Sequence, residues 1–395
     1  MKIIDRIKSL AETNFSQIQS FRHHLHQNPE LSFQEYKTAE FVKQQLEKIG
    51  ISNIQIVGKT GVTTIISGSS TGKTIALRAD LDALPIKELN EVSYRSKNEG
   101  IMHACGHDVH TSCLLGAAMI LHELREHWPG EVKLIFQPGE EKSPGGASIL
   151  IKEGILKNPR PSQILGQHVT PLIATGKVGF RSGKYMASAD EIYLKIIGKG
   201  GHSALPESLV DPIIISSQIL INLQQIASRK SSPTTPTVLS FGDIHGNGAT
   251  NVIPDEVNIA GTFRTFDEKW RKEAHEWIKQ IAKQTAEASG GRCEVRIVAG
   301  YPFLVNDEDV TARSKSAAAE YLGEKNVEDL DLWMGAEDFA FYSHELPACF
   351  YRLGTGNKAK NITSGVHTST FDIDERALEI GSGLMAWMAI SALNG

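Results

Sequence analysis

Hydrophobic and polar positions in the first half of the chain alternate between helical and strand patterns. Apolar residues at helical spacing predict a helix over Tyr36–Ile49, and Gly50 is well placed to end it. Four β-rich runs predict strands at 62–66, 74–77, 132–136 and 164–169, and we predict helices at 109–122 and 146–153. Strands that alternate with helices indicate an α/β sheet covered on both faces.

The pattern changes near Ala187. Here we predict strands at 192–197, 238–244, 257–263 and 293–298 and helices at 211–226 and 268–288. Four strands and two helices make a two-layer α+β unit of one small domain. After Gly300 the α/β pattern returns and ends in a helix at 375–393. We therefore expect one α/β domain, formed by residues 1–184 and 300–395, that is interrupted by an inserted α+β domain, residues 185–299.

Composition narrows the class of protein. The 395 residues include 41 Lys+Arg and 46 Asp+Glu, a formal net charge of −5, and 41% are hydrophobic. This is typical of a soluble globular protein, without the basic excess that binding to nucleic acid or an anionic membrane requires. Four scattered cysteines fit a reducing compartment, and the first ten residues lack a signal-peptide pattern. We expect a cytoplasmic protein with a small-molecule substrate.

Two segments resemble signatures that they do not complete. Residues 68–74 (GSSTGKT) resemble a phosphate-binding loop, but one residue is missing between the glycines and a strand follows instead of a helix. We predict a polar hairpin turn there. His122 and His127 resemble the histidine pair of a zinc-protease helix, but they are five residues apart instead of four and do not share a helix face.

The strongest candidate chemistry lies in four segments far apart in the sequence. Residues 103–110 (HACGHDVH) place a thiol and several imidazoles in one loop, where Gly106 permits a tight turn. Alone, this loop is equally consistent with a buried structural cysteine among histidines. Adjacent acids follow an apolar strand at 137–141 (QPGEE), and single histidines occur at His168, at a strand end, and at His367, in a glycine-containing loop. Each of these three segments alone also fits a structural or solvated role.

Together and in this order, these motifs resemble the aminoacylase and hippurate hydrolase family of dinuclear-metal amidohydrolases. They are most similar to the branch of bacterial N-acyl-amino-acid amidohydrolases and plant auxin-conjugate hydrolases. Further matches, spread over nearly the whole chain, are 22–26 (RHHLH), 78–85 (RADLDALP) and 334–339 (MGAEDF). The resemblance implies a mixed central sheet flanked by helices, as in zinc exopeptidases, with an inserted two-layer α+β lid domain.

The resemblance also assigns roles to residues of the predicted catalytic domain. It implies five metal ligands, namely Cys105, His107, Glu141, His168 and His367, with Glu140 as the general acid/base. Five protein ligands suit two divalent ions better than one tetrahedral site, and the mixture of donors leaves Zn, Mn, Co and Ni open. More distant relatives have a ligating histidine just after the strand that we expect to end at Arg78, where this chain has Ala79 and Asp80, so we expect Asp80 and Asp82 to support the ligands instead.

The inserted domain carries three more residues of the family pattern. The loop 198–206 (GKGGHSALP) contains His202, which in relatives reaches the scissile carbonyl, and Asn251 and Arg264 match substrate-binding positions. In dimeric relatives the histidine acts in the neighbouring subunit, whereas some members of the branch are monomers. The resemblance thus leaves open a homodimer through the lid domain.

The function that we expect is metal-dependent hydrolysis of the amide bond of N-acetyl or N-benzoyl L-amino acids. In this mechanism Glu140 takes a proton from water and returns it to the leaving amine, and His202 stabilises the oxyanion. Within the same family, deacetylation of N-acetyl-diaminopimelate or dipeptide hydrolysis are alternatives. A non-catalytic metal-dependent binding protein is the alternative from another class, although the intact Glu140–Glu141 pair argues against it.

Overall fold

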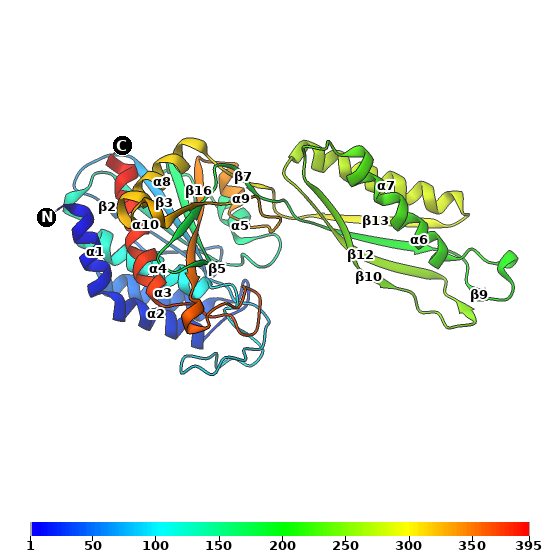
Figure 1. The fold of residues 1–395 in the computed structure, drawn as a ribbon, viewed down its shortest axis with the longest axis horizontal. Helices are drawn as coiled ribbons and strands as arrows, with labels where there is room; N and C mark the ends of the chain where they lie inside the picture. Colours follow the sequence, from blue (N-terminus) through cyan, green and yellow to red (C-terminus); the bar gives the residue numbers. More distant parts are fainter. Residues whose placement is uncertain (1, 395) are drawn as a thin grey trace. The chain divides into compact units, whose positions relative to one another are not determined.

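The computed structural model describes residues 2–394, which divide into two compact units (Figure 1). The first unit comprises the residues up to Tyr185, Val305–Leu332 and the residues from Asp338 onward. The second comprises Met186–Leu304 together with the short segment Trp333–Glu337. The chain therefore passes between the units four times.

An eight-stranded mixed sheet organises the first unit, with strand order β1-β2-β4-β3-β5-β16-β6-β15. Strands β4, β3, β5 and β16 are mutually parallel in the centre, and β2 and β6 pair antiparallel to them. The strands of this unit, including two that lie outside this sheet, are β1 (Gln55–Val57), β2 (Gly61–Ser67), β3 (Thr74–Asp80), β4 (Glu131–Gln137), β5 (Gln163–Ala174), β6 (Val178–Phe180), β7 (Gly183–Met186), β14 (Leu304–Asn306), β15 (Val327–Asp329) and β16 (Ala348–Gly356).

Helices cover this sheet, as expected for central parallel strands that are buried at every position. Every residue of β3 and of β16 is buried. Helices α4 and α10 lie side by side and pack against β3 (Figure 1). The helices of this unit are α1 (Ile3–Thr13), α2 (Phe15–Gln27), α3 (Tyr36–Ile49), α4 (His107–Glu123), α5 (Gly146–Lys152), α8 (Glu308–Leu322), α9 (Ala340–Ser343) and α10 (Arg376–Asn394).

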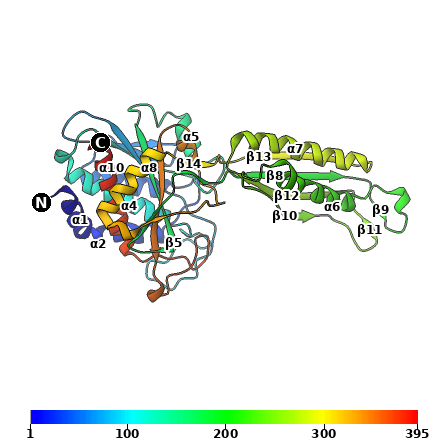
Figure 2. The ribbon, with the colours of Figure 1, turned by 45° about the horizontal axis from the view of Figure 1, so that its top comes forward.

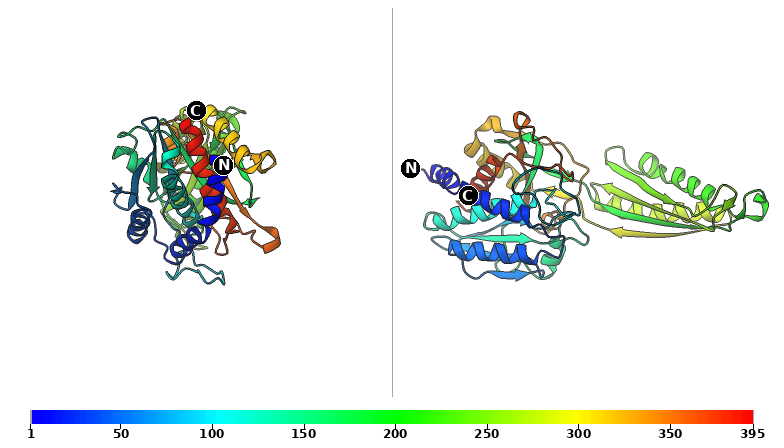
Figure 3. Two further views of the ribbon diagram at one scale, coloured as in Figure 1. Left: turned by 90° about the vertical axis from the view of Figure 1, so that its left-hand side faces the viewer. Right: turned by 90° about the horizontal axis from the view of Figure 1, so that it is seen from below.

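The second unit has two layers. A four-stranded antiparallel sheet with order β10-β12-β8-β13 carries the helices on one face (Figure 2 and Figure 3, right). Its own core includes Ile192, Ile219 and Ile278. Its elements are β8 (Asp190–Ile197), β9 (Gly201–His202), α6 (Pro212–Leu223), a π-helical turn (Ile226–Lys230), β10 (Thr237–His245), β11 (Val252–Ile253), β12 (Glu256–Thr265), α7 (Glu268–Ala288) and β13 (Arg292–Ala299).

The mixed α/β class predicted from the sequence is confirmed, but two local predictions are wrong. Residues 68–74 do not form a hairpin turn, because β4 lies between β2 and β3 and pairs with both. The predicted helix at 211–226 ends at Leu223, and a separate π-helical turn follows. Among the described residues, no helix combines the length and apolar character that crossing a membrane requires.

Candidate metal centre

The candidate site lies where the central strands of the first unit end. In the register of β3 and β4, Asp80 is opposite Gln137, so the two strands end at the same level. Arg78 is opposite Gly166 of β5, which places His168 level with Asp80. The carboxyl ends of parallel strands meet at one edge of a sheet, where α/β proteins bind ligands. The backbone thus brings together segments that are about 30 to 90 residues apart in the sequence.

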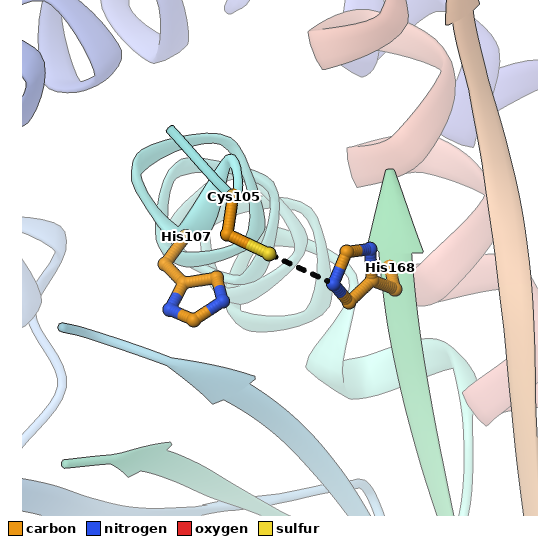
Figure 4. A group of neighbouring side chains, drawn as sticks. All are labelled: Cys105, His107 and His168. Carbon is orange, nitrogen blue, oxygen red and sulfur yellow. Dashed lines mark hydrogen bonds between the residues drawn. The ribbon is translucent and has the colours of Figure 1, made fainter. Parts of the chain in front are cut away.

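A left-handed turn delivers Cys105 and His107 to this edge. Gly106 has φ +81°, and a Cβ there would lie 2.5 Å from Val169 Cγ2, so both conformation and space require glycine. Cys105 Sγ lies 3.4 Å from His168 Nε2, and the ring of His107 lies beside this pair (Figure 4). All three side chains are buried. One thiol and two imidazoles therefore converge on a single point.

Glu141 and His367 complete the cluster on its other side. His367 Nε2 lies 3.3 Å from Cys105 Sγ and 3.2 Å from Glu141 Oε1. The backbone N–H of His367 donates to the carbonyl of Ala104, so the loop that carries His367 is tied to the loop that carries Cys105. Cys105 is common to two groups of donor atoms that are close enough to hold an ion: one with His107 and His168, and one with Glu141 and His367.

The donors fit divalent metal ions. The Nε2 atom of His107 is buried and makes no hydrogen bond. Asp80 Oδ2 at 3.8 Å and one oxygen each of Glu140 and Glu141 at 4.0 Å surround it, all beyond hydrogen-bond distance. A buried lone pair that faces carboxylates across such a gap is the arrangement that ligands adopt around a cation. Thiolate, imidazole and carboxylate donors together suit borderline metals.

The electrostatics of the cluster also favour positive charge. Burial opposes protonation of His107, but the carboxylates of Asp80 and Asp82 outweigh it and raise its pKa to about 10. Burial and the nearby Glu141 raise the pKa of Cys105 well above its usual range. A cation at this point would reverse both effects, because it stabilises the thiolate and competes with the proton of the imidazole.

Asp82 contacts three residues of the candidate site. Its Oδ1 lies 3.2 Å from His107 Nδ1 and accepts the backbone N–H of Glu140 at 3.0 Å. Its Oδ2 accepts the backbone N–H of Glu141 at 2.9 Å and the hydroxyl of Ser32 at 2.6 Å. Burial disfavours the charged form, but the hydrogen bond with His107 and the other donors lower the pKa of Asp82 below its ordinary value. Asp82 is therefore an anchor shared by His107, Glu140 and Glu141.

Asp80 has different partners. One of its oxygens lies 2.6 Å from His110 Nδ1, and the other accepts a hydrogen bond from Arg78 at 2.6 Å. Burial opposes ionisation, yet the positive charge of the neighbouring His107, His110 and Arg78 holds the pKa of Asp80 well below its usual range.

Glu140 lies next to the cluster without being part of the group centred on Cys105. Its Oε2 is 4.0 Å from His107 Nε2, and its Oε1 accepts the backbone N–H of Asp338 at 3.4 Å. Glu140 is 6% exposed, so its carboxylate is largely shielded from bulk water. This is a suitable environment for a group that exchanges protons with a substrate.

The remaining candidate residues are in the second unit, at opposite ends of its sheet. His202 in β9 pairs with Val252 in β11, and Asn251 precedes Val252, so His202 and Asn251 are neighbours. Arg264 is near the far end of β12, half-buried, and donates to the carbonyl of Met334 at 3.2 Å. Eight strand positions separate Arg264 from Glu256, and His202 lies beyond Glu256. The distance between Arg264 and His202 is therefore about 27 Å or more.

Two buried residues of the site were not anticipated from the sequence. Glu35 accepts the backbone N–H of Gly139 at 2.8 Å, and Asp338 accepts from Arg78 at 2.8 Å. Glu35 directly precedes a helix, where an acid looks like an ordinary solvated residue. Only the shared MGAEDF motif gave a signal for Asp338, and nothing local gave one for Glu35.

Comparison with known proteins identifies the family. A family model described as Peptidase family M20/M25/M40 matches residues 76–390, about four-fifths of the chain. The chain belongs to this family. Membership in the M20 family confirms the resemblance found in the sequence and the prediction of a metal-dependent amidohydrolase.

Individual M20 relatives align over most of their length. The N-acyl-L-amino acid amidohydrolase of Geobacillus stearothermophilus is 42% identical, covering 77% of this chain and 82% of that protein. The IAA-amino acid hydrolase ILR1-like 4 of Arabidopsis thaliana is 38% identical, covering 98% and 89%. The crystal structure of the Bacillus subtilis YXEP protein, described as a dinuclear metal-binding peptidase, superposes with a TM-score of 0.82 at 34% identity, covering 97% and 99%.

Proposed function

We propose that this M20 protein hydrolyses the amide bond of N-acyl-L-amino acids to a carboxylic acid and a free amino acid, using two divalent metal ions. The observation that carries the proposal is the convergence of five donor side chains on two overlapping groups that share Cys105. Relatives named N-acyl-L-amino acid amidohydrolase and IAA-amino acid hydrolase support this substrate class.

Five residues would hold the two ions: Cys105, His107, Glu141, His168 and His367. Bound divalent ions supply Lewis acidity, which makes water a stronger nucleophile at neutral pH and polarises the substrate carbonyl. The buried sulfur of Cys105 lies between His168 and His367, so it would be available as a donor to both groups.

Glu140 is the proton carrier in this proposal. Its carboxylate is at the rim of the ligand cluster, with Oε1 held by the N–H of Asp338 and Oε2 facing His107. A carboxylate in this place can take a proton from the attacking water and pass it to the amine that leaves. Because Glu141 is the adjacent ligand, the two neighbouring acids divide the work between metal binding and proton transfer.

Substrate recognition involves the second unit. Arg264 carries a cation suited to the carboxylate of an amino acid, and His202 and Asn251 carry donors suited to the carbonyl oxygen. A small amide cannot bridge the roughly 27 Å or more between Arg264 and His202. We therefore infer that a complete site takes Arg264 from one chain and His202 and Asn251 from a second copy.

A face of the second unit supports pairing with such a copy. Helix α6 exposes Ile213, Ile214 and Ile221 at 41%, 61% and 71%, and the adjacent edge strand β10 exposes Ile244 at 54%. Exposed apolar side chains next to an unpaired strand edge are typical of a protein interface. A two-fold pairing through α6 and β10 would cover both features.

We also propose a cytoplasmic location for the protein. All four are buried and unpaired, which supports a reducing, cytoplasmic environment.

A substrate screen with a matched variant tests the proposed chemistry. Enzyme reconstituted separately with Zn, Mn, Co or Ni would be assayed on N-acetyl-L-methionine, N-benzoylglycine, N-acetyl-diaminopimelate and a dipeptide. We expect turnover of N-acyl amino acids, and for Glu140→Gln a loss of about 10²- to 10⁴-fold in kcat with two metals still bound. Preference for the dipeptide or for N-acetyl-diaminopimelate would select the alternative substrate. Absence of turnover with every metal would refute the proposal that the protein is an amidohydrolase.

A mixing experiment tests the shared site. In a random mixture of Glu140→Gln and His202→Ala chains, half of the dimers are mixed and each mixed dimer has one intact site, so activity should recover to about a quarter of wild type. If His202 serves its own chain, no mixed dimer has an intact site and activity stays at the level of the separate variants. Ile221→Asp should convert the dimer to a monomer in light scattering.

A further inference from the structure

The turn that carries Glu140 and Glu141 is held by its backbone. Three successive N–H groups donate to buried carboxylates: Gly139 to Glu35 at 2.8 Å, and Glu140 and Glu141 to the two oxygens of Asp82 at 3.0 and 2.9 Å. The turn follows the end of β4, where pairing with the neighbouring strands stops. These carboxylates therefore set the direction in which the side chains of Glu140 and Glu141 point.

Glu35, which accepts the N–H of Gly139, lies directly before a helix. It precedes α3, yet its side chain does not cap that helix. The side chain is instead turned inward and is fully buried, where it accepts the N–H of Phe33 at 2.9 Å, the N–H of Gly139 at 2.8 Å and the hydroxyl of Thr60 at 2.7 Å. Burial and the nearby Asp82 raise the pKa of Glu35 to about 7.

Burying a carboxyl group costs free energy, whereas an exposed acid at the same place would favour the helix. The burial of Glu35 therefore calls for a role other than helix stability. Its three donors come from three separate segments of the chain, and one of them, Gly139, is the residue next to Glu140.

Phe33 fits the same turn from the other side. It has φ +65°, a conformation that is uncommon for a bulky residue. Gly139 has φ +59°, and a Cβ there would lie 2.3 Å from Phe33 Cε1. Ser32, one residue earlier, donates to Asp82 at 2.6 Å. The segment 32–35 thus contacts the turn through the ring of Phe33 and the carboxyl group of Glu35. The hydroxyl of Ser32 binds Asp82, the other carboxylate that holds the turn.

We propose that Glu35 is a positioning residue: it holds the N–H of Gly139, and so aims the carboxylate of Glu140 at the reacting water and amine. The inference rests on the proposed role of Glu140 as proton carrier. Glu35 itself does not touch the five donor side chains of the candidate centre in any hydrogen bond of the described residues. Its loss should therefore change the rate of proton transfer and leave metal binding intact.

Two substitutions separate the acceptor from the charge. Glu35→Gln keeps an oxygen for the N–H groups of Gly139 and Phe33 and can donate its amide to Thr60, so kcat should stay within about threefold of wild type. Glu35→Leu removes the acceptor, and kcat should fall about 10- to 100-fold with KM unchanged and two metals per chain. Thr60→Val removes a donor to the same carboxyl group without touching Gly139, and serves as the control with unchanged kcat.

Measured in the reconstituted full chain on N-acetyl-L-methionine, the outcomes are distinct. If the leucine variant does not fold, Glu35→Asp takes its place. Its carboxylate is shorter by one C–C bond, about 1.5 Å, and cannot reach Gly139, so we expect the same loss of kcat. The proposal is overturned if folded Glu35→Leu or Glu35→Asp keeps full kcat, if glutamine is as damaging as leucine, or if metal content falls with activity. Full activity of Glu140→Gln would instead refute the role of Glu140, whatever Glu35 does.

Discussion

Replacement of Asp82 by Asn should weaken metal binding without changing the shape of the side chain. The carboxylate accepts from His107, from the N–H groups of Glu140 and Glu141 and from Ser32. An amide has one acceptor oxygen, so its NH2 group must face one of the two pairs of donors. If the NH2 group faces Ser32 and Glu141, the hydroxyl of Ser32 can rotate to accept a hydrogen bond from it, but the N–H of Glu141 loses its acceptor.

The size of the effect follows from that orphaned group. A buried N–H without an acceptor costs about 1–3 kcal/mol, which corresponds to roughly 5- to 150-fold in an equilibrium constant. With the amide turned the other way, its NH2 faces His107 Nδ1, and the imidazole proton moves to Nε2, the atom that faces the metal site. Either orientation disturbs a ligand, so we expect about 10- to 100-fold weaker metal binding, the range typical for such supporting residues.

Competition with a chromophoric chelator would measure this affinity, and elemental analysis would give the metal content. Asp309→Asn, at an exposed position of α8, makes the same exchange of carboxylate for amide and is a matched control that should leave the affinity for metal unchanged. If Asp82→Asn binds both ions as tightly as wild type, Asp82 does not position the ligands, and the reasoning fails.

Two further predictions concern stability. Removal of the metals with a chelator should lower the melting temperature, because ions that bind only the folded state stabilise it by mass action; an unchanged melting curve would contradict metal binding by the cluster around Cys105. In the second unit, burial raises the pKa of Asp190, but hydrogen bonds from Arg271 at 2.9 Å and with His275 at 2.7 Å outweigh it and lower the pKa below its ordinary value. The stability from this group is complete above the unfolded pKa of about 3.9 and is lost as pH falls through the lower folded pKa. Asp190→Asn should therefore flatten the acid limb of urea-denaturation stability against pH, and an identical pH dependence in both proteins would refute this.

The sequence predicted helices and central strands where local patterns are strong. The bounds Tyr36–Ile49 of α3 agree with the structure, since an amphipathic stripe ends at Gly50, which has φ +93°. Strand β16 was missed although it is wholly buried, because Arg352 and its glycines hide the hydrophobic run. The error at 68–74 has another cause: no local pattern shows that β4, synthesised later, inserts between β2 and β3.

In the candidate site, too, the sequence predicted what local motifs mark and missed what depends on distant contacts. The motifs, taken together with the family resemblance, selected Cys105, Glu141 and His168 as candidates, and β4 and β5 bring Glu141 and His168 to one edge of the sheet. Glu35 could not be selected in this way. Its role depends on a hydrogen bond to a residue 104 positions away, and that contact exists only after the chain has folded.

The pairing of β16 with β5 has a consequence for the order of folding during synthesis. Ala348 lies opposite Ile164, 184 residues earlier in the chain, and the whole second unit is synthesised between them. At 5–20 residues per second the nascent sheet waits roughly 9 to 37 s for its missing central strand. The second unit has its own core and can form in that interval. His367, one of the proposed ligands, emerges later still, so complete metal loading would follow the formation of the fold instead of nucleating it.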